Sequence, residues 1–525
     1  MYTRWSSASV EGVDGRLIEV EVDIASGLPQ VSIVGLPDPA VRESVDRVRA
    51  AIRNCGMQFP LERITVNLAP ADLRKQGTAF DLAIAAGVLG ASGQLGAALP
   101  ERTMLIGELA LDGSVRAVPG VLAMAEQARD CGMTNVALPA DNLSEASLIG
   151  GLRLLGIGHL RQLIEAAAAA CSEQAERLWV SAEQVQRSAG GPGMAATGPE
   201  AYDYGEVLGQ HHAKRALLTA AAGRHNIVLS GPPGTGKTML IRRLPGIMPL
   251  LDDAEALEVT KIHSIAGKLG AGPAALIRSR PFRDPHHTIS AGGLIGGGTH
   301  PRPGEATLAH RGILFLDELP EFSRAALEAL RQPLEDRSVT IARTRAVHRF
   351  PAHFMLAATM NPCPCGYYGD ESGEWEAPRC SCSARKIEAY RMKISGPLLD
   401  RIDLQVEVPR PPSFGEAAAG MDTASMLERV ALARERQTAR SEQAGTSWNS
   451  ELSGRALREH ARLSGEAQLL LQEAYRSLGL SLRAHDRILK LARTVADLDD
   501  RAEIGAAHVA EAIQYRAFDR APVQG

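Results

Sequence analysis

Long apolar runs, a strong net charge and internal repeats are all missing from this chain of 525 residues. No uncharged apolar stretch reaches the roughly 18–20 residues that a membrane span requires, so we expect no contact with a membrane. Residues 1–5 lead directly into polar sequence, and we expect no cleavable signal and a cytoplasmic location. The formal net charge is only −4, which excludes a uniformly basic surface and restricts any DNA contact to a local patch.

A glycine-rich segment predicts a nucleotide-binding site. Residues 231–238 read Gly-Pro-Pro-Gly-Thr-Gly-Lys-Thr, and an apolar run at 227–229 precedes them. In such a phosphate loop, backbone N–H groups point at the β-phosphate, Lys237 places a positive charge at the β- and γ-phosphates, and Thr238 offers a hydroxyl to Mg²⁺. The predicted cofactors are therefore ATP and Mg²⁺. The expected nucleotide-binding residues are Gly231, Pro232, Pro233, Gly234, Thr235, Gly236, Lys237 and Thr238.

Two more apolar runs end in polar residues that can act on a bound nucleotide. The run at 313–316 leads into Asp317 and Glu318, as expected of a buried parallel strand that delivers carboxylates to the edge of a sheet. We expect Asp317 to hold Mg²⁺ through water and Glu318 to polarise the attacking water. The run at 354–359 leads towards Asn361, whose amide is suited to contact the γ-phosphate. An acidic pair after a strand is more often a turn, but beside a phosphate loop it predicts an ATPase site.

Arg401 and Arg483 are candidates to complete this ATP site. Arg401 ends the stretch Gly-Pro-Leu-Leu-Asp-Arg, and Arg483 ends the stretch Ser-Leu-Arg. A surface arginine taken alone is usually just solvated. The spacing does not say which subunit's ATP either arginine would contact.

The order of these motifs resembles the ComM/YifB family of magnesium-chelatase-like AAA+ ATPases. The glycine-rich stretch 289–298, the stretch Pro-Gly-Glu-Ala-Thr-Leu-Ala-His at 303–310 and the stretch Asn-Pro-Cys-Pro-Cys-Gly at 361–366 strengthen the resemblance. It extends from near residue 1 to about residue 520. It implies an α/β fold class, with an AAA+ core built on a parallel sheet and a helical lid after it.

The resemblance also implies a hexameric ring that acts on DNA. Arg401 would reach the neighbour's ATP as an arginine finger, and Arg483 would close from the lid on the γ-phosphate of its own subunit. Gly209 and Gln210 would lie near the adenine. Family members are associated with DNA branch migration during recombination of imported single strands, with recombination proteins as candidate partners. The alternative is a protein-remodelling ATPase that acts on a partner protein, like the motor subunit of magnesium chelatase.

A basic segment before the third strand is the predicted contact with DNA. Residues 337–349 contain four arginines and one histidine but no acidic residue, which predicts a β-hairpin with Arg343 and Arg345 at its tip. In the resembling helicases this hairpin lines the channel and touches phosphates, without reading sequence. The alternative is a solvated edge hairpin that its arginines protect from aggregation. The glycine-rich run 292–298 is a second pore candidate, because its apolar Leu294 and Ile295 would be costly to expose in a monomer.

Four of the seven cysteines form two tight pairs, Cys363-x-Cys365 and Cys380-x-Cys382. Fourteen residues of polar loop separate the pairs, and four thiolates that close such a loop suit tetrahedral zinc. Disulfides are disfavoured in a reducing cytosol. Because the spacing departs from the usual Cys-x₂-Cys, free thiols stay the alternative. A zinc ion with four protein ligands would be structural, since no position is left for water.

The first 170 residues resemble the proteolytic domain of Lon proteases, through motifs at 74–81 and 106–113. The resemblance raises a rival class of function, an ATP-dependent protease. Ala79 stands where that family has its nucleophilic serine, and Leu122 where it has the activating lysine. Neither side chain can serve in serine–lysine catalysis, so we expect an inactive domain.

Composition and periodicity divide the chain into four parts. Strand-like runs alternate with helical stretches in the first part, and glycines and prolines at 188–200 indicate a flexible linker. Apolar residues at helical spacing mark the last part. The predicted parts are an α+β domain at 1–170, a linker at 171–203, the ATPase core at 204–410 with a zinc-type insert at 363–382, and the lid at 411–525.

Overall fold

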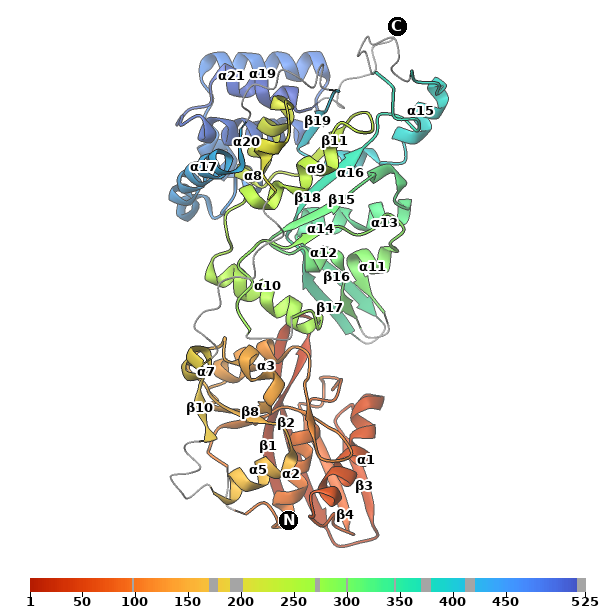
Figure 1. Ribbon diagram of the computed structural model, residues 1–525, viewed down its shortest axis with the longest axis vertical. Helices are drawn as coiled ribbons and strands as arrows, with labels where there is room; N and C mark the ends of the chain where they lie inside the picture. Colours follow the sequence, from red (N-terminus) through yellow and green to blue (C-terminus); the bar gives the residue numbers. More distant parts are fainter. Residues whose placement is uncertain are drawn as a thin grey trace. The chain divides into compact units, whose positions relative to one another are not determined.

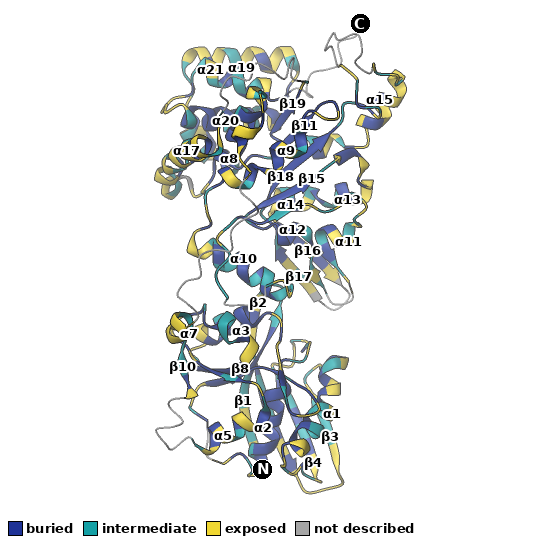
Figure 2. Cartoon of the chain, in the orientation of Figure 1, coloured by how far each residue is buried: buried dark blue, intermediate teal, exposed yellow. Residues whose placement is uncertain are grey.

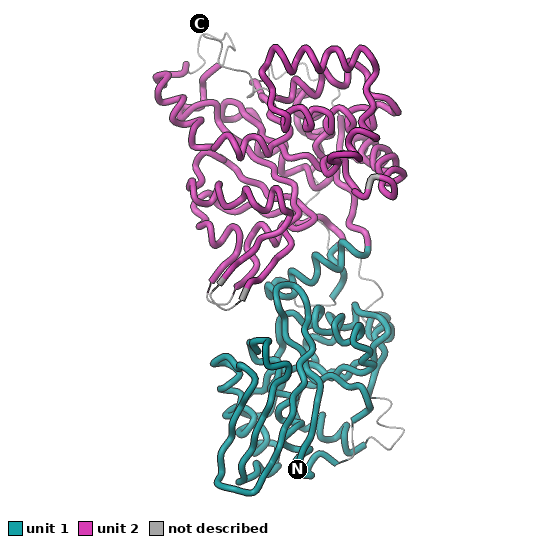
Figure 3. The backbone as a smooth tube through the Cα atoms, turned by 180° about the vertical axis from the view of Figure 1, so that it is seen from behind, with its two compact units in different colours: residues 1–197, 253–277 teal, residues 198–252, 278–525 magenta. Residues whose placement is uncertain are grey.

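The computed structural model divides the chain into two compact units (Figure 3). Residues 1–197 and 253–277 form the first unit, and residues 198–252 and 278–525 form the second. The residues that the structure describes are 1–96, 99–169, 178–188, 202–269, 274–298, 301–343, 346–369, 379–410 and 421–516.

These units divide the chain differently from the predicted parts. The segment 253–277, predicted inside the ATPase core, groups with the amino-terminal residues, while the core and the lid share the second unit. The predicted linker contains regular structure, because β10 (Val180–Ser181) joins the sheet of the first unit and α7 (Ala182–Ser188) follows it. Residues 189–201, the glycine- and proline-rich part of that linker, lie outside the described residues.

The first unit is built on a mixed sheet, which has eight strands among the described residues (Figure 1). Ile18, Val20 and Val22 are buried at every second position of β2, the alternation of a strand with one face on a core. In sheet order after β10, the strands are β9 (Arg153–Ile157), β8 (Asn135–Pro139), β5 (Thr103–Leu105), β1 (Tyr2–Glu11), β2 (Asp14–Ala25), β4 (Arg63–Ala69) and β3 (Gln30–Val34). A short hairpin, β6 (Glu108–Leu109) and β7 (Val115–Arg116), lies apart from this sheet.

Helices of the first unit pack on this sheet. A side chain at Gly87 of α2 would clash with Val22 of β2, so the glycine allows the helix to lie directly on the strand. Helix α10 belongs here because Lys261 donates to Glu126 at 2.6 Å and Ser264 donates to Glu145. The helices are α1 (Pro39–Asn54), α2 (Asp81–Ala91), α3 (Val121–Asp130), α4 (Leu143–Ala146), α5 (Leu160–Ala168) and α10 (Asp253–Ile265).

The second unit contains a parallel sheet, which confirms that prediction (Figure 1). All described neighbours pair in parallel, and β11, β15 and β18 are buried on both faces, as Figure 2 shows in dark blue. The carboxyl ends of these three strands therefore meet at one edge. In sheet order the strands are β12 (Phe282–Arg283), β15 (Ile313–Leu316), β18 (Met355–Met360), β11 (Ile227–Ser230) and β19 (Leu404–Glu407).

Helices surround this sheet and make up most of the carboxyl-terminal residues. The amphipathic α20 buries Ile488, Leu491 and Val495 at helical spacing, so one face joins the core of the unit. Around the sheet lie α8 (His211–Gly223), α9 (Lys237–Arg242), α12 (Glu305–Leu308), α13 (Arg324–Ala329), α14 (Arg331–Asp336), α15 (Ala384–Arg391) and α16 (Gly396–Leu399). The later helices are α17 (Thr423–Ala444), α18 (Gly454–His460), α19 (Gly465–Leu478), α20 (Leu482–Leu498) and α21 (Ala506–Gln514).

Two smaller features bear on the sequence predictions. The expected basic hairpin is confirmed, with β16 (Ser338–Arg343) antiparallel to β17 (Ala346–Pro351). The glycine-rich run forms α11 (Ala291–Ile295) and β13 (Gly296–Gly297), which pairs with β14 (Arg302–Pro303). Leu294 is fully buried within this unit, so its burial needs no neighbouring subunit and that argument is wrong for Leu294, while Ile295 is only partly buried. Within the described ranges, no helix has the length and apolarity to cross a bilayer.

Candidate nucleotide-binding and metal sites

The phosphate loop connects β11 to α9, as its sequence predicted. A Cβ atom at Gly231 would collide with the carbonyl oxygen of Val408, so this position requires glycine. Gly236 has a φ of 84°, in the left-handed region that favours glycine, and Lys237 then begins α9. The first helical N–H groups consequently face the loop, an arrangement that binds phosphate.

Lys237 lies at the centre of the loop. Its Nζ donates to the carbonyl oxygens of Gly231 at 2.6 Å and Pro232 at 2.8 Å, and to Oδ1 of Asn361 at 3.3 Å. Burial lowers the pKa of Lys237 to about 8, although Asp317 and Glu318 act in the opposite direction. A phosphate group placed beside this buried ammonium would favour its charged form, so the residue suits a polyanionic ligand.

Thr238 and Asp317 lie together, as a magnesium site requires. The Thr238 hydroxyl is 3.2 Å from both carboxylate oxygens of Asp317. A hydroxyl and a carboxylate are the hard oxygen ligands that Mg²⁺ prefers, alongside water and phosphate oxygens. The described residues therefore fit a magnesium–nucleotide complex at the position that the sequence predicted.

Thr359 is a site residue that the sequence analysis missed. Its hydroxyl donates to Asp317 and accepts the backbone N–H of Glu318 at 3.1 Å. The parallel register of β15 and β18, in which Leu316 pairs with Ala358, brings the threonine opposite these acids. The sequence does show a hydroxyl near the end of β18. Its role can be recognised only when β18 is known to neighbour β15 in the sheet.

Glu318 is oriented differently from Asp317. Its backbone has a φ of 55° and its carboxylate is 56% exposed, so the acid is accessible to water. Nδ1 of His287 lies 3.9 Å from its Oε2. An accessible carboxylate at the end of the strand agrees with the predicted role in polarising water.

Gln210 reaches the phosphate loop from the start of α8. Its Nε2 donates to the carbonyl of Pro409 at 2.8 Å and lies 3.5 Å from the carbonyl of Thr235. Gly209 precedes it in the chain. The structure thus places the Gly209–Gln210 turn beside the loop, while a contact with adenine stays a prediction.

Arg401 and Arg483 lie together in what we call the arginine pocket, lined by Leu334, Glu335, Asp400, Arg401, Arg483 and Arg487. Arg401 pairs with Glu335 and donates to the carbonyl of Pro397 at 2.7 Å. The pKa of Glu335 is lowered by its hydrogen bond to Arg401 and by the nearby positive charges of Arg483 and Arg487. No residue of the phosphate loop lines this pocket. The structure thus brings Arg401 and Arg483 together, while the roles that the resemblance implies for them stay predictions.

The structure shows side-chain contacts for two of the four arginines in the segment 337–349. Arg349 donates to Ser338 at 3.1 Å, and Arg337 lies 3.7 Å from Glu451. Arg343 ends β16 with its side chain outside the described residues, and Arg345 lies outside them entirely. The hairpin therefore exists as predicted, while its basic tip stays a prediction.

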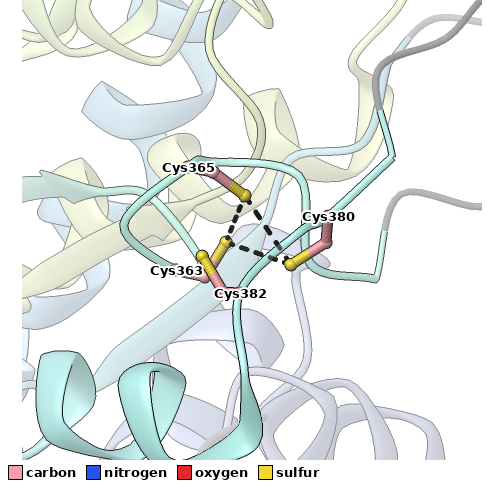
Figure 4. Close-up of side chains that lie close together, drawn as sticks. All are labelled: Cys363, Cys365, Cys380 and Cys382. Carbon is pink, nitrogen blue, oxygen red and sulfur yellow. Dashed lines mark hydrogen bonds between the residues drawn. The ribbon is translucent and has the colours of Figure 1, made fainter.

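The four clustered cysteines point toward one another (Figure 4). Cys363 Sγ lies 3.3 Å from Cys365 Sγ and 3.7 Å from Cys380 Sγ, and Cys365 Sγ lies 3.6 Å from Cys380 Sγ. All four sulfur atoms, including that of Cys382, lie within 4.8 Å of one another. Tetrahedral zinc with Zn–S bonds of about 2.3 Å holds its sulfurs about 3.8 Å apart, so the cluster fits zinc.

The first unit contains no serine–lysine pair at the positions that the Lon resemblance singles out. Ala79 and Leu122 are both buried and belong to one hydrophobic cluster. The two positions thus fall in the same cluster, but their apolar side chains offer neither a nucleophile nor a base.

Comparisons with known proteins agree with these sites. Three family descriptions match successive parts of the chain: subunit ChlI of Mg-chelatase at residues 20–142, magnesium chelatase subunit ChlI at 203–414, and the ChlI C-terminal part at 420–516. Protein Rv2897c of Mycobacterium tuberculosis is 45% identical over 97% of both chains. YifB of Escherichia coli is 42% identical over 97% of this chain and 96% of its own. The competence protein ComM of Haemophilus influenzae is 41% identical over 98% and 97%. With its phosphate loop, acidic pair and parallel sheet, the chain belongs to the ComM/YifB family of magnesium-chelatase-like AAA+ ATPases.

Proposed function

We propose that the protein is an ATP-hydrolysing hexameric ring motor that acts on DNA and promotes branch migration during recombination of imported single strands. The observation that carries the ATPase part is the convergence of Lys237, Thr238, Asp317 and Asn361 at the carboxyl ends of three adjacent strands. The relative named competence protein ComM supports the DNA part, because competence is the uptake of DNA.

Each residue at the phosphate loop has a defined role in hydrolysis. Lys237 neutralises charge on the β- and γ-phosphates, while Thr238 and Asp317 hold Mg²⁺. Glu318 accepts a hydrogen bond from the attacking water, and Asn361 orients that water and the γ-phosphate. Phosphoryl transfer needs positioning and charge neutralisation rather than covalent chemistry, so these side chains suffice on this side of the nucleotide.

The arginine pocket supplies positive charge to an ATP held by the neighbouring subunit. Arg401 and Arg483 share this pocket, which supports a trans role for both, although the family resemblance implied a cis role for Arg483. An arginine that meets the γ-phosphate at a subunit interface stabilises the charge of the transition state. A closed ring then gives every phosphate loop a neighbouring arginine pocket.

The basic hairpin is the proposed contact with DNA. A net charge of −4 leaves no broad basic surface, but six hairpin tips converging in a ring would form a local basic channel around Arg343 and Arg345. Contacts with phosphates would be independent of sequence and would weaken steeply as salt is raised.

A second candidate function is remodelling of a partner protein. It is favoured by the family descriptions, which name magnesium chelatase and no nucleic acid. The two functions differ in what stimulates ATP hydrolysis. A DNA motor is stimulated by single-stranded DNA through Arg343 and Arg345, whereas a protein remodeller is not.

A three-strand exchange assay with the purified protein, ATP and Mg²⁺ tests the proposal. We expect strand exchange that depends on ATP and disappears in Lys237→Ala, together with an ATPase rate that rises with single-stranded DNA. Arg343→Ala/Arg345→Ala is expected to lose the stimulation by DNA and keep the basal rate. Unstimulated hydrolysis and unchanged DNA binding in that double variant would favour the protein remodeller.

A further inference from the structure

The cysteine cluster is continuous with the nucleotide site. Cys363 follows Asn361 by two residues, and Asn361 accepts the hydrogen bond from Lys237 at 3.3 Å. Cys363 is fully buried, so the cluster begins inside the core of the second unit. Any displacement of Cys363 is therefore transmitted through a single residue, Pro362, to a side chain that contacts the phosphate-binding lysine.

Gly366, the first residue after the first cysteine pair, also packs on the phosphate loop. Gly366 follows Cys365 directly and has a φ of 89°. A Cβ atom added at Gly366 would lie 2.6 Å from Cδ of Pro233, which is the third residue of the phosphate loop. The cluster thus touches the nucleotide site at two separate points, Asn361 and Pro233.

A third connection returns from the other end of the cluster. Helix α15 begins two residues after Cys382, and it brings Tyr390 and Arg391 back to the first cysteine pair. Tyr390 lies close to the backbone of Asn361, and Arg391 Nε donates to the carbonyl of Pro362 at 3.4 Å. Helix α15, which follows the last cysteine, therefore lies against the same short segment, residues 361–362, that leads into the first cysteine.

The four clustered cysteines need a bound cation to hold their sulfur atoms this close together. Four thiolates within 4.8 Å of one another repel strongly without a positive ion between them, and four neutral thiols form only weak hydrogen bonds. A metal ion converts the repulsion into four bonds and closes the polar loop between the two pairs. The energy that fixes the loop, and with it the position of Asn361 and Gly366, is then the energy of metal binding.

We propose that Zn²⁺ held by Cys363, Cys365, Cys380 and Cys382 positions Asn361 and the loop at Gly366 against the phosphate loop, so that zinc binding and nucleotide binding strengthen each other. The inference rests on the proposed ATP site. Coupling of this kind is reciprocal, because a ligand that favours the ordered loop must be favoured by it to the same extent. The cysteines are positioning residues and do not touch the nucleotide.

Removal of two ligands tests the coupling from the zinc side. In Cys380→Ser/Cys382→Ser we expect zinc, measured by elemental analysis, to fall from one ion per chain to none, and the Kd of a fluorescent non-hydrolysable ATP analogue to rise about tenfold. Cys131→Ser, an exposed cysteine outside the cluster, is the matched control and should change neither quantity. A soluble, zinc-free double variant with an unchanged circular dichroism spectrum and an unchanged Kd overturns the proposal, as does a wild-type protein without zinc.

Two glycine variants test the contact itself. Gly366→Ala and Gly369→Ala both place alanine at a positive φ, 89° and 78°, but only the Cβ atom at 366 meets another residue within 4 Å. We expect Gly366→Ala to weaken binding of the analogue severalfold with zinc retained, and Gly369→Ala to leave the affinity unchanged. Equal effects of the two variants would show that the contact with Pro233 contributes nothing.

The reciprocal measurement is decided by the wild-type protein, and Lys237→Ala serves only as its control. Saturating ADP should slow the transfer of zinc to a chromogenic chelator severalfold in the wild type, and should have no effect in Lys237→Ala. A wild-type release rate that is the same with and without bound ADP overturns the coupling. If Lys237→Ala still binds nucleotide as tightly as the wild type, the proposed ATP site fails instead, so the two failures are distinguishable.

Discussion

At the phosphate loop, backbone carbonyls and carboxylates surround one buried lysine, whereas the arginine pocket is lined by three arginines and two acids, Glu335 and Asp400. Lys237 finds its partners in Gly231, Pro232 and Asn361, and Arg401 finds its partner in Glu335. The first site can hold phosphates and a metal but has little positive charge to spare. The second has three arginines, and no residue of the phosphate loop lines it. The proposed ATP site, divided between two subunits, would combine the phosphate loop of one with the arginines of the other.

Mixing two defective subunits is the strongest test of whether the phosphate loop and the arginine pocket of neighbouring subunits form one ATP site. Lys237→Ala removes the phosphate-loop lysine and Arg401→Ala removes the arginine finger, and each is expected to reduce ATP turnover at least about 100-fold. In a mixed ring, roughly a quarter of the interfaces combine an intact phosphate loop with an intact arginine pocket, so turnover should partly recover. Steady-state ATPase assays of equal mixtures measure this, with sedimentation to verify assembly. If both variants assemble normally and the mixture stays inactive, the divided site is wrong.

A second mixture decides on which side Arg483 acts. If Arg401 and Arg483 both serve the neighbour, an interface built from Arg401→Ala and Arg483→Ala subunits always lacks one arginine, and mixing should restore nothing. If Arg483 served its own subunit, some interfaces would contain both arginines and turnover would return. We expect no rescue between these two variants, and rescue of each by Lys237→Ala. Recovery of turnover in the mixture of Arg401→Ala and Arg483→Ala subunits would instead support the cis role that the family resemblance implied for Arg483.

The pH dependence of nucleotide binding tests the state of Lys237. Burial lowers its pKa to about 8, so the ammonium is charged at pH 7 and largely neutral at pH 9. Because only the charged form attracts phosphate, affinity for ATP should fall about tenfold over that interval. Arginine stays protonated throughout, so Lys237→Arg should bind with little change between the two pH values. A wild-type affinity that is constant from pH 7 to pH 9 would contradict the depressed pKa.

The sequence predicted the phosphate-loop site more completely than the arginine pocket. Glycine spacing and apolar runs that end in polar residues are local signals, and the structure brings the residues they singled out, Lys237, Asp317 and Asn361, close together. The position of Arg483 depends instead on how α20 packs against the sheet, which helical periodicity does not specify. The placement of α10 has the same limit, because no local signal in the sequence tells which unit it packs in, and it joins the first unit.

Thr359 shows the same limit within the phosphate-loop site, because its role follows from the strand order and register. Thr359→Val removes the hydroxyl that contacts Asp317 and Glu318, and we expect ATP turnover to fall about fivefold with a stability loss of about 1–2 kcal/mol. Thr359→Ser keeps the hydroxyl and should retain most of the turnover.

Thr359 lies on the phosphate-loop side of the proposed ATP site. The division between phosphate loop and arginine pocket therefore also predicts how Thr359→Val subunits behave in mixed rings. Arg401→Ala subunits carry an intact phosphate loop and Thr359→Val subunits an intact arginine pocket, so mixing these two should produce interfaces with wild-type turnover. Mixing Thr359→Val with Lys237→Ala should not, because every phosphate loop in that ring is impaired. Turnover per intact interface can be read from the dependence of the rate on the mixing ratio. A Thr359→Val variant that Lys237→Ala subunits rescue as well as Arg401→Ala subunits do would place the threonine's effect outside the phosphate-loop site.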